Sequence, residues 1–367
     1  MKKRSGREKP STRWIYRGLS GLVRLLARIP FPVSQKLGRR MGGLFACIPL
    51  KRPRVAVENL LASFGPALSR PEAERLYRRL MGHFGAMLFE LPHIFTMTER
   101  SLSRYVTFDH PERMEQALAK GKGCFILTAH FGNWELMSAA ACLRYAPNAA
   151  VVARPMDFPP VERLFTDLRT RFGTEVIPKD HGMRRIMRVL RENRPIGILL
   201  DQNVDWYAGV FVPFMGRPAC TNKGLALMAL KTGAPVVPIY ALREADGRYR
   251  VVFEEEVRLC VTGDKTRDVE ENTRIFTEII ESWVRRHPEQ WFWFHRRWKT
   301  RPFCPLPGAA FPPAGGAPSD TFAAAPGGCS GKGPPGGAAA CASTVDAATV
   351  CTDGANVPTL SPIGGPA

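Results

Sequence analysis

One short segment of the sequence combines a histidine, a carboxylate and turn-forming residues in a pattern that can move protons. His130 and Glu135 lie in the segment 128–135, directly after the apolar run 123–129. An apolar run that leads into His-x-Gly-Asn and a helical pattern places the histidine at the carboxyl edge of a sheet, where open α/β sheets bind ligands. Glu135 could then reach back to one imidazole nitrogen and leave the other as a general base. The alternative is a strand-end histidine and a glutamate that stabilises a helix N-terminus.

The residues between this pair favour a turn that brings backbone N–H groups to the site. Gly132 permits a tight turn or a close approach of the backbone. Asn133 is a typical helix N-cap, and the N–H groups around 132–134 would then face the substrate as donors to an oxyanion. The spacing differs from the zinc motif HExxH and suggests no third ligand, so we expect no metal and no cofactor.

Other polar residues also follow apolar runs. Arg154 ends the run 149–153, and Arg171 lies on the helical stretch after it. A guanidinium group suits phosphate recognition because it binds two oxygens at once, although arginines without function are common on surfaces. Asp201 follows the run 196–200 and opens a third polar stretch.

Two segments are unusually apolar or aromatic. The segment 209–219, which includes Arg217, predicts a long loop rather than a tight turn, as the wall of a binding site or a membrane-dipping segment. The segment 289–299 places five aromatic residues beside four potential cations. It could stack on nucleic-acid bases, form an interfacial belt, or belong to the core at Trp291 and Trp293.

The elements that must position these residues alternate between strands and helices, which predicts an α/β fold with a mixed, largely parallel sheet flanked by helices. We expect strands near 124–129, 149–153, 175–177, 196–200, 236–241 and 249–254. We expect helices near 134–143, 161–172, 183–193, 223–232 and 268–287. Ser69 with Glu72 predicts a capped helix start in the helical region before the sheet.

Charge and composition divide the chain of 367 residues, whose net charge is +19, into three parts. Residues 303–367 hold 12 Gly and 11 Pro, and we expect this tail to be disordered. Residues 1–54 carry 15 Lys or Arg and one acidic residue, with apolar residues between evenly spaced arginines. That pattern favours membrane-associating amphipathic helices over a solvated basic helix. Residues 55–302 remain as the catalytic domain.

Taken in order, these blocks resemble the late acyltransferases (lauroyl/myristoyl transferases) of lipid A biosynthesis, within the lysophospholipid acyltransferase superfamily. The resemblance covers roughly residues 15–302. The matching stretches are 130–135, 154–155, 209–219, 235–238, 287–291 and 295–301, together with Arg54 and Asn59-Leu60 near the N-terminus.

The resemblance implies transfer of a fatty acyl chain from acyl carrier protein to a hydroxyl of a phosphorylated glycolipid, a lipid A precursor. It makes His130 the general base and Glu135 its orienting carboxylate. It assigns substrate binding to Gly132, Asn133, Arg154, Arg171, Asp201 and Arg217. The family often begins with a spanning helix, whereas arginines interrupt this N-terminus. We therefore expect a peripheral or monotopic enzyme, or one with a single N-terminal anchor, on the cytoplasmic face of the inner membrane.

The sequence leaves three alternatives open. The same chemistry could act on another glycolipid, such as a phosphatidylinositol mannoside, or on a lysophospholipid. The donor could be acyl-coenzyme A. A basic protein without catalysis could bind membranes or nucleic acid, although the motifs favour an enzyme and we expect no nucleic-acid partner.

Overall fold

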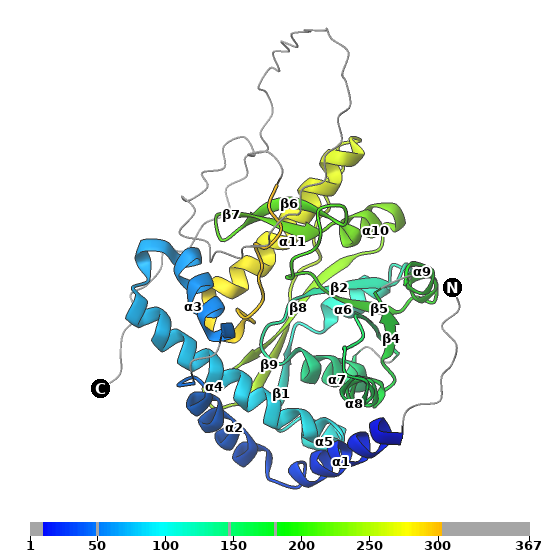
Figure 1. Cartoon of the computed structure of the whole chain (residues 1–367). Coiled ribbons are helices and arrows are strands. Elements are labelled where there is room, and N and C mark those ends of the chain that lie inside the picture. The colour runs from blue at the N-terminus through cyan, green and yellow to red at the C-terminus, as the bar shows by residue number, and fades with distance from the viewer. Residues whose placement is uncertain (1–9, 49–50, 146–147, 180–181, 303–367) are drawn as a thin grey trace, which may run out of the picture. The chain divides into compact units, whose positions relative to one another are not determined.

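A seven-stranded mixed sheet lies at the centre of the computed structural model, which describes residues 10–48, 51–145, 148–179 and 182–302 (Figure 1). Its strands pair in the order β1-β9-β8-β2-β5-β3-β4, and β8 and β9 are the antiparallel neighbours. In that order they span Val106–Asp109, Tyr249–Phe253, Val236–Arg243, Cys124–Thr128, Pro195–Leu199, Ala150–Ala153 and Glu175–Pro178. The predicted α/β fold with a largely parallel sheet is therefore confirmed.

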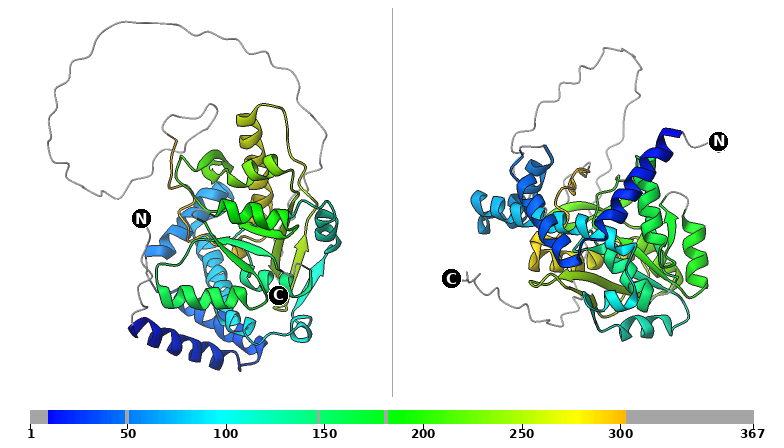
Figure 2. Two further views of the ribbon diagram at one scale, coloured as in Figure 1. Left: turned by 90° about the vertical axis from the view of Figure 1, so that its right-hand side faces the viewer. Right: turned by 90° about the horizontal axis from the view of Figure 1, so that it is seen from below.

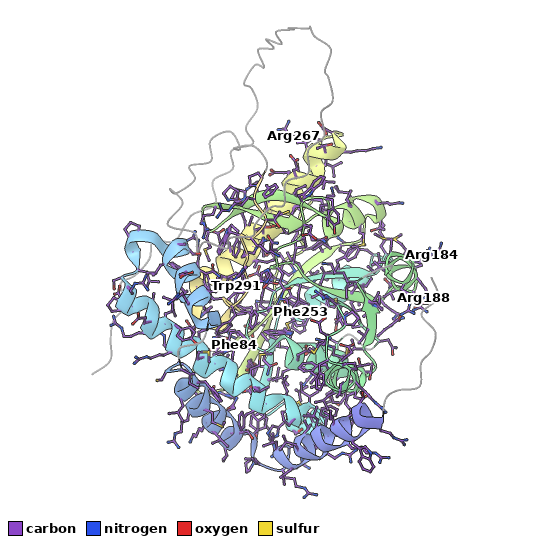
Figure 3. The ribbon with its side chains drawn as sticks, viewed as in Figure 1. Phe84, Arg184, Arg188, Phe253, Arg267 and Trp291 are labelled. Carbon is purple, nitrogen blue, oxygen red and sulfur yellow. The ribbon has the colours of Figure 1, made fainter. Side chains whose placement is uncertain are left out.

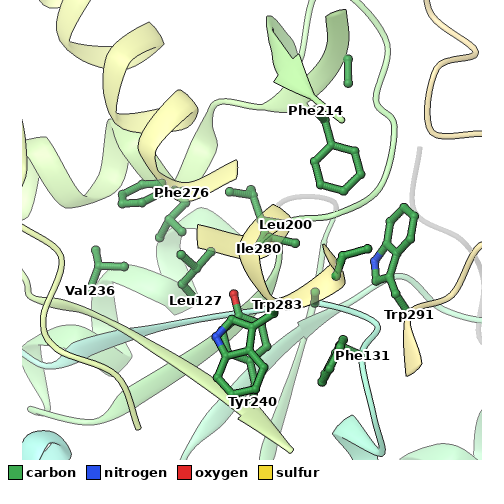
Figure 4. Packing of buried hydrophobic residues seen from close by; sticks show 14 of the residues in the cluster. Leu127, Phe131, Leu200, Phe214, Val236, Tyr240, Phe276, Ile280, Trp283 and Trp291 are labelled. Carbon is green, nitrogen blue, oxygen red and sulfur yellow. The ribbon is translucent and has the colours of Figure 1, made fainter. Parts of the chain in front are cut away.

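Helices cover both faces of this sheet, and the alternating side chains of β2 show the division. Phe125 and Leu127 pack in one apolar cluster with α9, α10 and α11, part of which Figure 4 shows. Ile126 packs in a second cluster with α6, α7 and α8 on the other face. The helices span α6 Glu112–Leu118, α7 Trp134–Arg144, α8 Pro159–Thr170, α9 Met183–Arg191, α10 Gly224–Thr232 and α11 Lys265–Arg286.

A group of helices precedes the sheet, and its member α4 packs against α2 and α3. The group consists of α1 Pro10–Leu26, α2 Phe31–Phe45, α3 Lys51–Phe64, α4 Arg70–Ile94 and the short α5 Glu99–Leu102. α4 begins as predicted, because the backbone N–H of Ser69 donates to Glu72 in a capping box. α2 crosses α4 so closely that a Cβ at Gly38 would lie 2.4 Å from the Gly85 carbonyl oxygen. This face of α2 therefore belongs to the body of the protein.

α1 lies on the outside of the molecule, beside α8 (Figure 2). The Tyr16 hydroxyl donates to Asp167 of α8, and the Arg163 guanidinium lies over the Tyr16 ring. Large apolar side chains on α1 and α2 point to solvent: Trp14, Ile15, Leu22, Leu25, Val33, Leu37, Leu44 and Phe45. A continuous helix, α3, crosses the predicted boundary at 54/55, and the predicted disordered tail 303–367 lies outside the described residues.

The segment 209–219 is a β-hairpin, so the prediction of a long loop was wrong. β6 (Gly209–Phe214) pairs antiparallel with β7 (Arg217–Asn222) as a separate two-stranded sheet. Met215 and Gly216 form the two-residue turn with φ of 52° and 71°, as the twist of a tight hairpin requires. Pro213 and Pro218 concealed the strands in the sequence; they are tolerated because they lie opposite each other in a two-stranded sheet that has only edge strands.

Candidate functional site

Residues from four parallel strands meet at the carboxyl edge of the sheet. His130 follows β2, Asp201 follows β5, Arg154 follows β3 and Lys179 follows β4. Three of them, His130, Arg154 and Lys179, line one cavity of about 730 Å³. The position of His130 that its sequence context predicts is confirmed.

Asp201 holds His130. The imidazole Nδ1–H donates to Asp201 Oδ1 at 2.8 Å, and the backbone N–H of His130 donates to Oδ2 of the same carboxylate at 2.9 Å. Two bonds to one carboxylate fix both the backbone and the ring. With Nδ1 bonded, Nε2 is the nitrogen left for a substrate, and the Gln202 amide nitrogen lies 3.3 Å from it.

The Asp201 carboxylate stays ionised although it is buried. Burial alone would raise its pKa, but the interaction with His130, two hydrogen bonds from that residue and one from the Trp291 indole lower the pKa to about 2. Trp291 Nε1–H donates to Oδ2 at 2.8 Å. Asp201 is 2% exposed and His130 is 22% exposed, so the charge lies behind the imidazole and only the imidazole meets the cavity. A buried negative charge at Nδ1 stabilises the protonated ring that forms when His130 accepts a proton.

Glu135 does not make the predicted hydrogen bond to the imidazole. Both oxygens of its buried carboxylate accept hydrogen bonds from Arg169 of α8, with Nε at 3.0 Å from Oε2. Glu135 lies in the first turn of α7, so its side chain projects toward α8 while the Nδ1 face of His130 turns toward β5. Glu135 and Arg169 nevertheless line the same cavity as His130.

The turn between His130 and Glu135 is built as predicted, but its residues face the protein interior. Gly132 has φ of 59°, and a Cβ there would lie 1.7 Å from the Ala241 carbonyl oxygen. Asn133 caps α7 by accepting from the Leu136 N–H at 3.0 Å, and it is fully buried. The Gly132 N–H donates to the Gln290 carbonyl oxygen at 2.9 Å. That N–H is therefore occupied, which corrects its expected role as an oxyanion donor.

A second polar cluster lies behind this turn, and we call it the Glu90 network: Gln35, His83, Glu90, Asn133, Arg243 and Tyr249. Glu90 accepts hydrogen bonds from the side chains of all of these except His83. His83 donates from Nε2 to the Gly132 carbonyl oxygen at 3.1 Å and accepts at Nδ1 from Arg243 at 3.2 Å. Burial, and then the Arg243 charge, lower the pKa of His83 to about 3, so this ring is neutral.

The cavity combines a polar end with an apolar interior. The polar end is lined by His130, Gln202, Asn203, His295, Glu135 and Arg169. Its apolar lining comes from β2, β3, β5, α7, α9 and α10: Ile126, Met137, Ala141, Ala150, Val151, Ile186, Ile198, Leu225 and Met228. β3 pairs with β5 only at Ala150 and Val151, so the cavity reaches both faces of the sheet where these strands diverge. A polar reaction centre beside such a channel suits a substrate with a hydrocarbon chain.

Two arginines predicted to bind substrate are not among the residues that line this cavity. Arg171 is exposed and donates to the Phe95 carbonyl oxygen at 3.3 Å. Arg217 lies over the Trp298 ring, with 4.3 Å from its guanidinium carbon to the ring centroid. Burial, together with the nearby charge of Arg301, lowers the pKa of Arg217. Arg154 does line the cavity and pairs with Asp157 at 3.2 Å.

Three residues that line the cavity were not predicted from the sequence: Arg169, Gln202 and His295. Arg169 was one of two arginines on a single helical stretch, and its helix face against α7 selects it over Arg171. His295 accepts from the Asn203 N–H at 2.7 Å, and burial lowers its pKa to about 4. The buried aromatic residues Trp291 and Trp293 confirm the core alternative for these two positions, and the bond to Asp201 adds a role for Trp291.

A histidine held by a buried carboxylate at the carboxyl edge of an α/β sheet, beside an apolar cavity, defines a site suited to general-base acyl transfer. The family model of bacterial lipid A biosynthesis acyltransferases matches residues 1–300. The chain therefore belongs to this family and is an O-acyltransferase acting on lipid A or a related glycolipid.

Individual relatives agree with this assignment. The chain is 25% identical to the lipid A biosynthesis lauroyltransferase of Escherichia coli over 284 residues, 77% of this chain and 90% of that protein. It is 26% identical to a lipid A biosynthesis acyltransferase of Haemophilus influenzae over 80% of this chain and 90% of that protein. A phosphatidylinositol mannoside acyltransferase of Mycobacterium tuberculosis is 28% identical over 59% of this chain and 67% of that protein. None of the helices within the described residues is both long and apolar enough to span a membrane.

Proposed function

We propose that this protein transfers a fatty acyl chain from acyl carrier protein to a hydroxyl of a phosphorylated lipid A precursor. The observation that carries the proposal is the His130–Asp201 pair, with an imidazole that opens onto a cavity whose interior is apolar. The family and its relatives support a glycolipid as the acceptor. The hydrogen bond between the His130 side chain and Asp201 supports general-base catalysis.

In the proposed reaction, His130 Nε2 removes the proton from the acceptor hydroxyl as its oxygen attacks the thioester carbonyl carbon. The carbonyl π electrons move onto oxygen and form a tetrahedral oxyanion. Collapse of that intermediate expels the thiolate, which takes the proton from His130. A hydroxyl is a weak nucleophile at neutral pH, and a positioned base is worth roughly 10²–10⁴-fold in rate. No residue of the enzyme is acylated.

Two further groups have proposed roles at this site. The Gln202 amide, beside the imidazole, donates to the oxyanion. Glu135 and Arg169 hold each other across α7 and α8 and form a charged wall, where the arginine attracts a phosphate group of a substrate. Glu135 thus supports the reaction from the cavity wall, and Asp201 takes the orienting role that the sequence assigned to Glu135.

The direct test is reconstitution with purified acyl carrier protein charged with a fatty acid and a tetraacylated lipid A precursor as acceptor. Mass spectrometry is expected to show one added acyl chain on the acceptor with the wild-type protein and none with His130→Ala. A product on a phosphatidylinositol mannoside or a lysophospholipid, with none on the lipid A precursor, would replace the proposed acceptor.

We also propose that α1 and α2 attach the enzyme to an anionic membrane surface, on the cytoplasmic face of the inner membrane. Their exposed apolar residues lie among arginines, as in interfacial helices. Replacing Trp14 and Leu22 together by serine is expected to weaken binding to phosphatidylglycerol vesicles at least tenfold in sedimentation. The same replacement of the exposed Val261 and Leu227, which lie elsewhere, is the matched control. Equal binding by both variants would contradict the proposal.

The domain division is a proposal as well: residues 1–54 for attachment, 55–302 for catalysis and 303–367 as a dispensable tail. A protein that ends at Pro302 is expected to keep wild-type transfer activity in the reconstitution. A folded but inactive truncation would show that the tail contributes.

A further inference from the structure

α9 carries a set of arginines that the reaction does not use. Arg184, Arg185 and Arg191 are exposed and have no ion-pair partner among the residues that the structure describes. With Arg188 they occupy the outer side of a nine-residue helix that contains no acidic residue. In Figure 3 the labelled side chains of Arg184 and Arg188 extend from α9 away from the body of the protein. The positions 184, 188 and 191 recur at helical spacing and span about 10 Å along the axis.

The opposite side of the same helix forms part of the cavity. Ile186 is buried and lines the cavity, and Met183 and Gly182 line it at the N-terminal end of α9. Lys179, just before this helix, is an exposed residue that also lines the cavity. The arginine surface therefore borders an opening that leads to His130.

α9 is attached to the protein by ion pairs of Arg188 and by the buried side chains of Ile186, Val189 and Leu190. Arg188 pairs with Glu175 of β4 and with Glu192, and Arg194 pairs with the same two carboxylates. These acidic residues are neutralised by Arg188 and Arg194, which leaves the charge of the other three arginines uncompensated within the described residues.

The position and chemistry of this surface favour a soluble acidic protein over a lipid surface. α9 covers the sheet face of Phe125 and Leu127, whereas α1, with its exposed apolar residues, packs on α8 at the other face. A helix that lies in a membrane interface needs large apolar side chains beside its cations. On α9 the only large apolar side chain that is exposed is Met183, at the cavity opening.

We propose that the arginine surface of α9 (Arg184, Arg185 and Arg191) is the docking site for the acidic acyl carrier protein that delivers the acyl thioester. The inference rests on the proposed function, since it assigns the donor of that reaction to a surface. An acyl carrier protein presents carboxylates around the serine that bears its phosphopantetheine arm. Contact between those carboxylates and α9 would direct the arm past Lys179 and Met183 toward His130. Complementary charge of this kind mainly raises the rate of association.

The test compares two donors that carry the same acyl chain: acyl carrier protein, and the uncharged N-acetylcysteamine thioester. Reversal of the three arginines to glutamate is expected to raise KM for acyl carrier protein at least tenfold and to leave kcat within about twofold. With the small thioester, kcat/KM should remain within about twofold of wild type. The wild-type kcat/KM for acyl carrier protein should fall with added salt, and that of the variant should not.

Reversal of Arg75, Arg78 and Arg79, which are exposed on α4, is the matched control for net charge and should leave both donors unaffected. An unchanged KM for acyl carrier protein in the α9 variant overturns the inference while the proposed function stands. Equal losses with both donors also overturn it, because the damage would then lie in the reaction site. A loss of binding to phosphatidylglycerol vesicles by the α9 variant would assign the surface to the membrane instead. Absence of transfer from either donor by the wild-type protein would refute the proposed function itself.

Discussion

Two buried carboxylates, Asp201 and Glu90, lie on opposite sides of the same turn and have different roles. Asp201 lies behind His130, whose Nε2 is on the cavity side, 3.3 Å from the Gln202 amide nitrogen. Glu90 lies on the inner side, where five hydrogen bonds from four side chains occupy both its oxygens. In the first arrangement the imidazole lines a cavity that a substrate can enter. In the second, side chains of the protein occupy both carboxylate oxygens. A carboxylate whose hydrogen-bond partners are all buried stabilises the fold, whereas one whose partner lines a cavity can support a reaction.

The largest effect is expected from a substitution that breaks the Glu90 network. Arg243→Met leaves the Glu90 charge buried without its cation, and we expect a loss of about 3–5 kcal/mol in the free energy of unfolding. Urea unfolding monitored by tryptophan fluorescence measures it. The exposed Arg248→Met, between β8 and β9, is the control and should change the free energy of unfolding by less than about 0.5 kcal/mol. Equal stability of the Arg243 variant would mean that the Glu90 network does not support the turn.

A substitution in the His130–Asp201 pair should lower the rate of acyl transfer more than the free energy of unfolding. Asp201→Asn keeps the shape but removes the charge behind the imidazole, so kcat should fall about 100-fold. Combined with His130→Ala, it should add little further loss, because the two residues act as a unit. Single-turnover acyl transfer measures both. Full additivity of the two losses would show that Asp201 acts independently of His130.

The two clusters should also differ in their dependence on pH. The folded-state pKa of His83 is about 3, below the usual 6.5, so the unfolded chain binds more protons between these values. The contribution of His83 to the free energy of unfolding is therefore fully present above about pH 6.5. It falls as the pH falls, by about 2 kcal/mol at pH 5. His83→Gln should reduce that loss, measured as the difference in unfolding free energy between pH 7.5 and pH 5. An identical pH dependence in the variant would contradict a buried neutral His83.

The smallest effect is expected at the cavity wall. Glu135→Gln weakens the hold on Arg169 without touching His130, and turnover should fall about tenfold, equivalent to the loss of one charged hydrogen bond. Glu281→Gln on α11 is the matched control, since Glu281 also pairs with an arginine, Arg285, and does not line the cavity. A loss as large as that of Asp201→Asn would return Glu135 to the orienting role that the sequence suggested.

Much of the fold could be predicted because its signals are local. Strands β2 to β5, β8 and β9 and helices α7 to α11 follow from apolar runs and helical periodicity, and the cap at Ser69 from a three-residue spacing, whereas β1 and α6 were not predicted. The hairpin at 209–222 could not, because two prolines conceal its strands. The location of His130 followed from the end of an apolar strand, and the cap at Asn133 from its residue type.

The contacts between the site residues could not be predicted from the sequence, because they join segments that are distant along the chain. Asp201 reaches His130 across the pairing of β2 with β5, 71 positions apart. Arg169 and Arg171 are two positions apart on one stretch, and only the packing of α8 on α7 separates them. Glu90 carried one usable signal: a carboxylate on the apolar side of a helix, between Met87 and Leu91, predicts a buried partner.

The central claim is that His130 is the base that activates the acceptor hydroxyl. Single-turnover transfer from acyl carrier protein to a lipid A precursor by His130→Ala tests it directly, once circular dichroism shows a folded variant. We predict a rate at least 100-fold below that of the wild-type protein. A rate within threefold of wild type would contradict the claim.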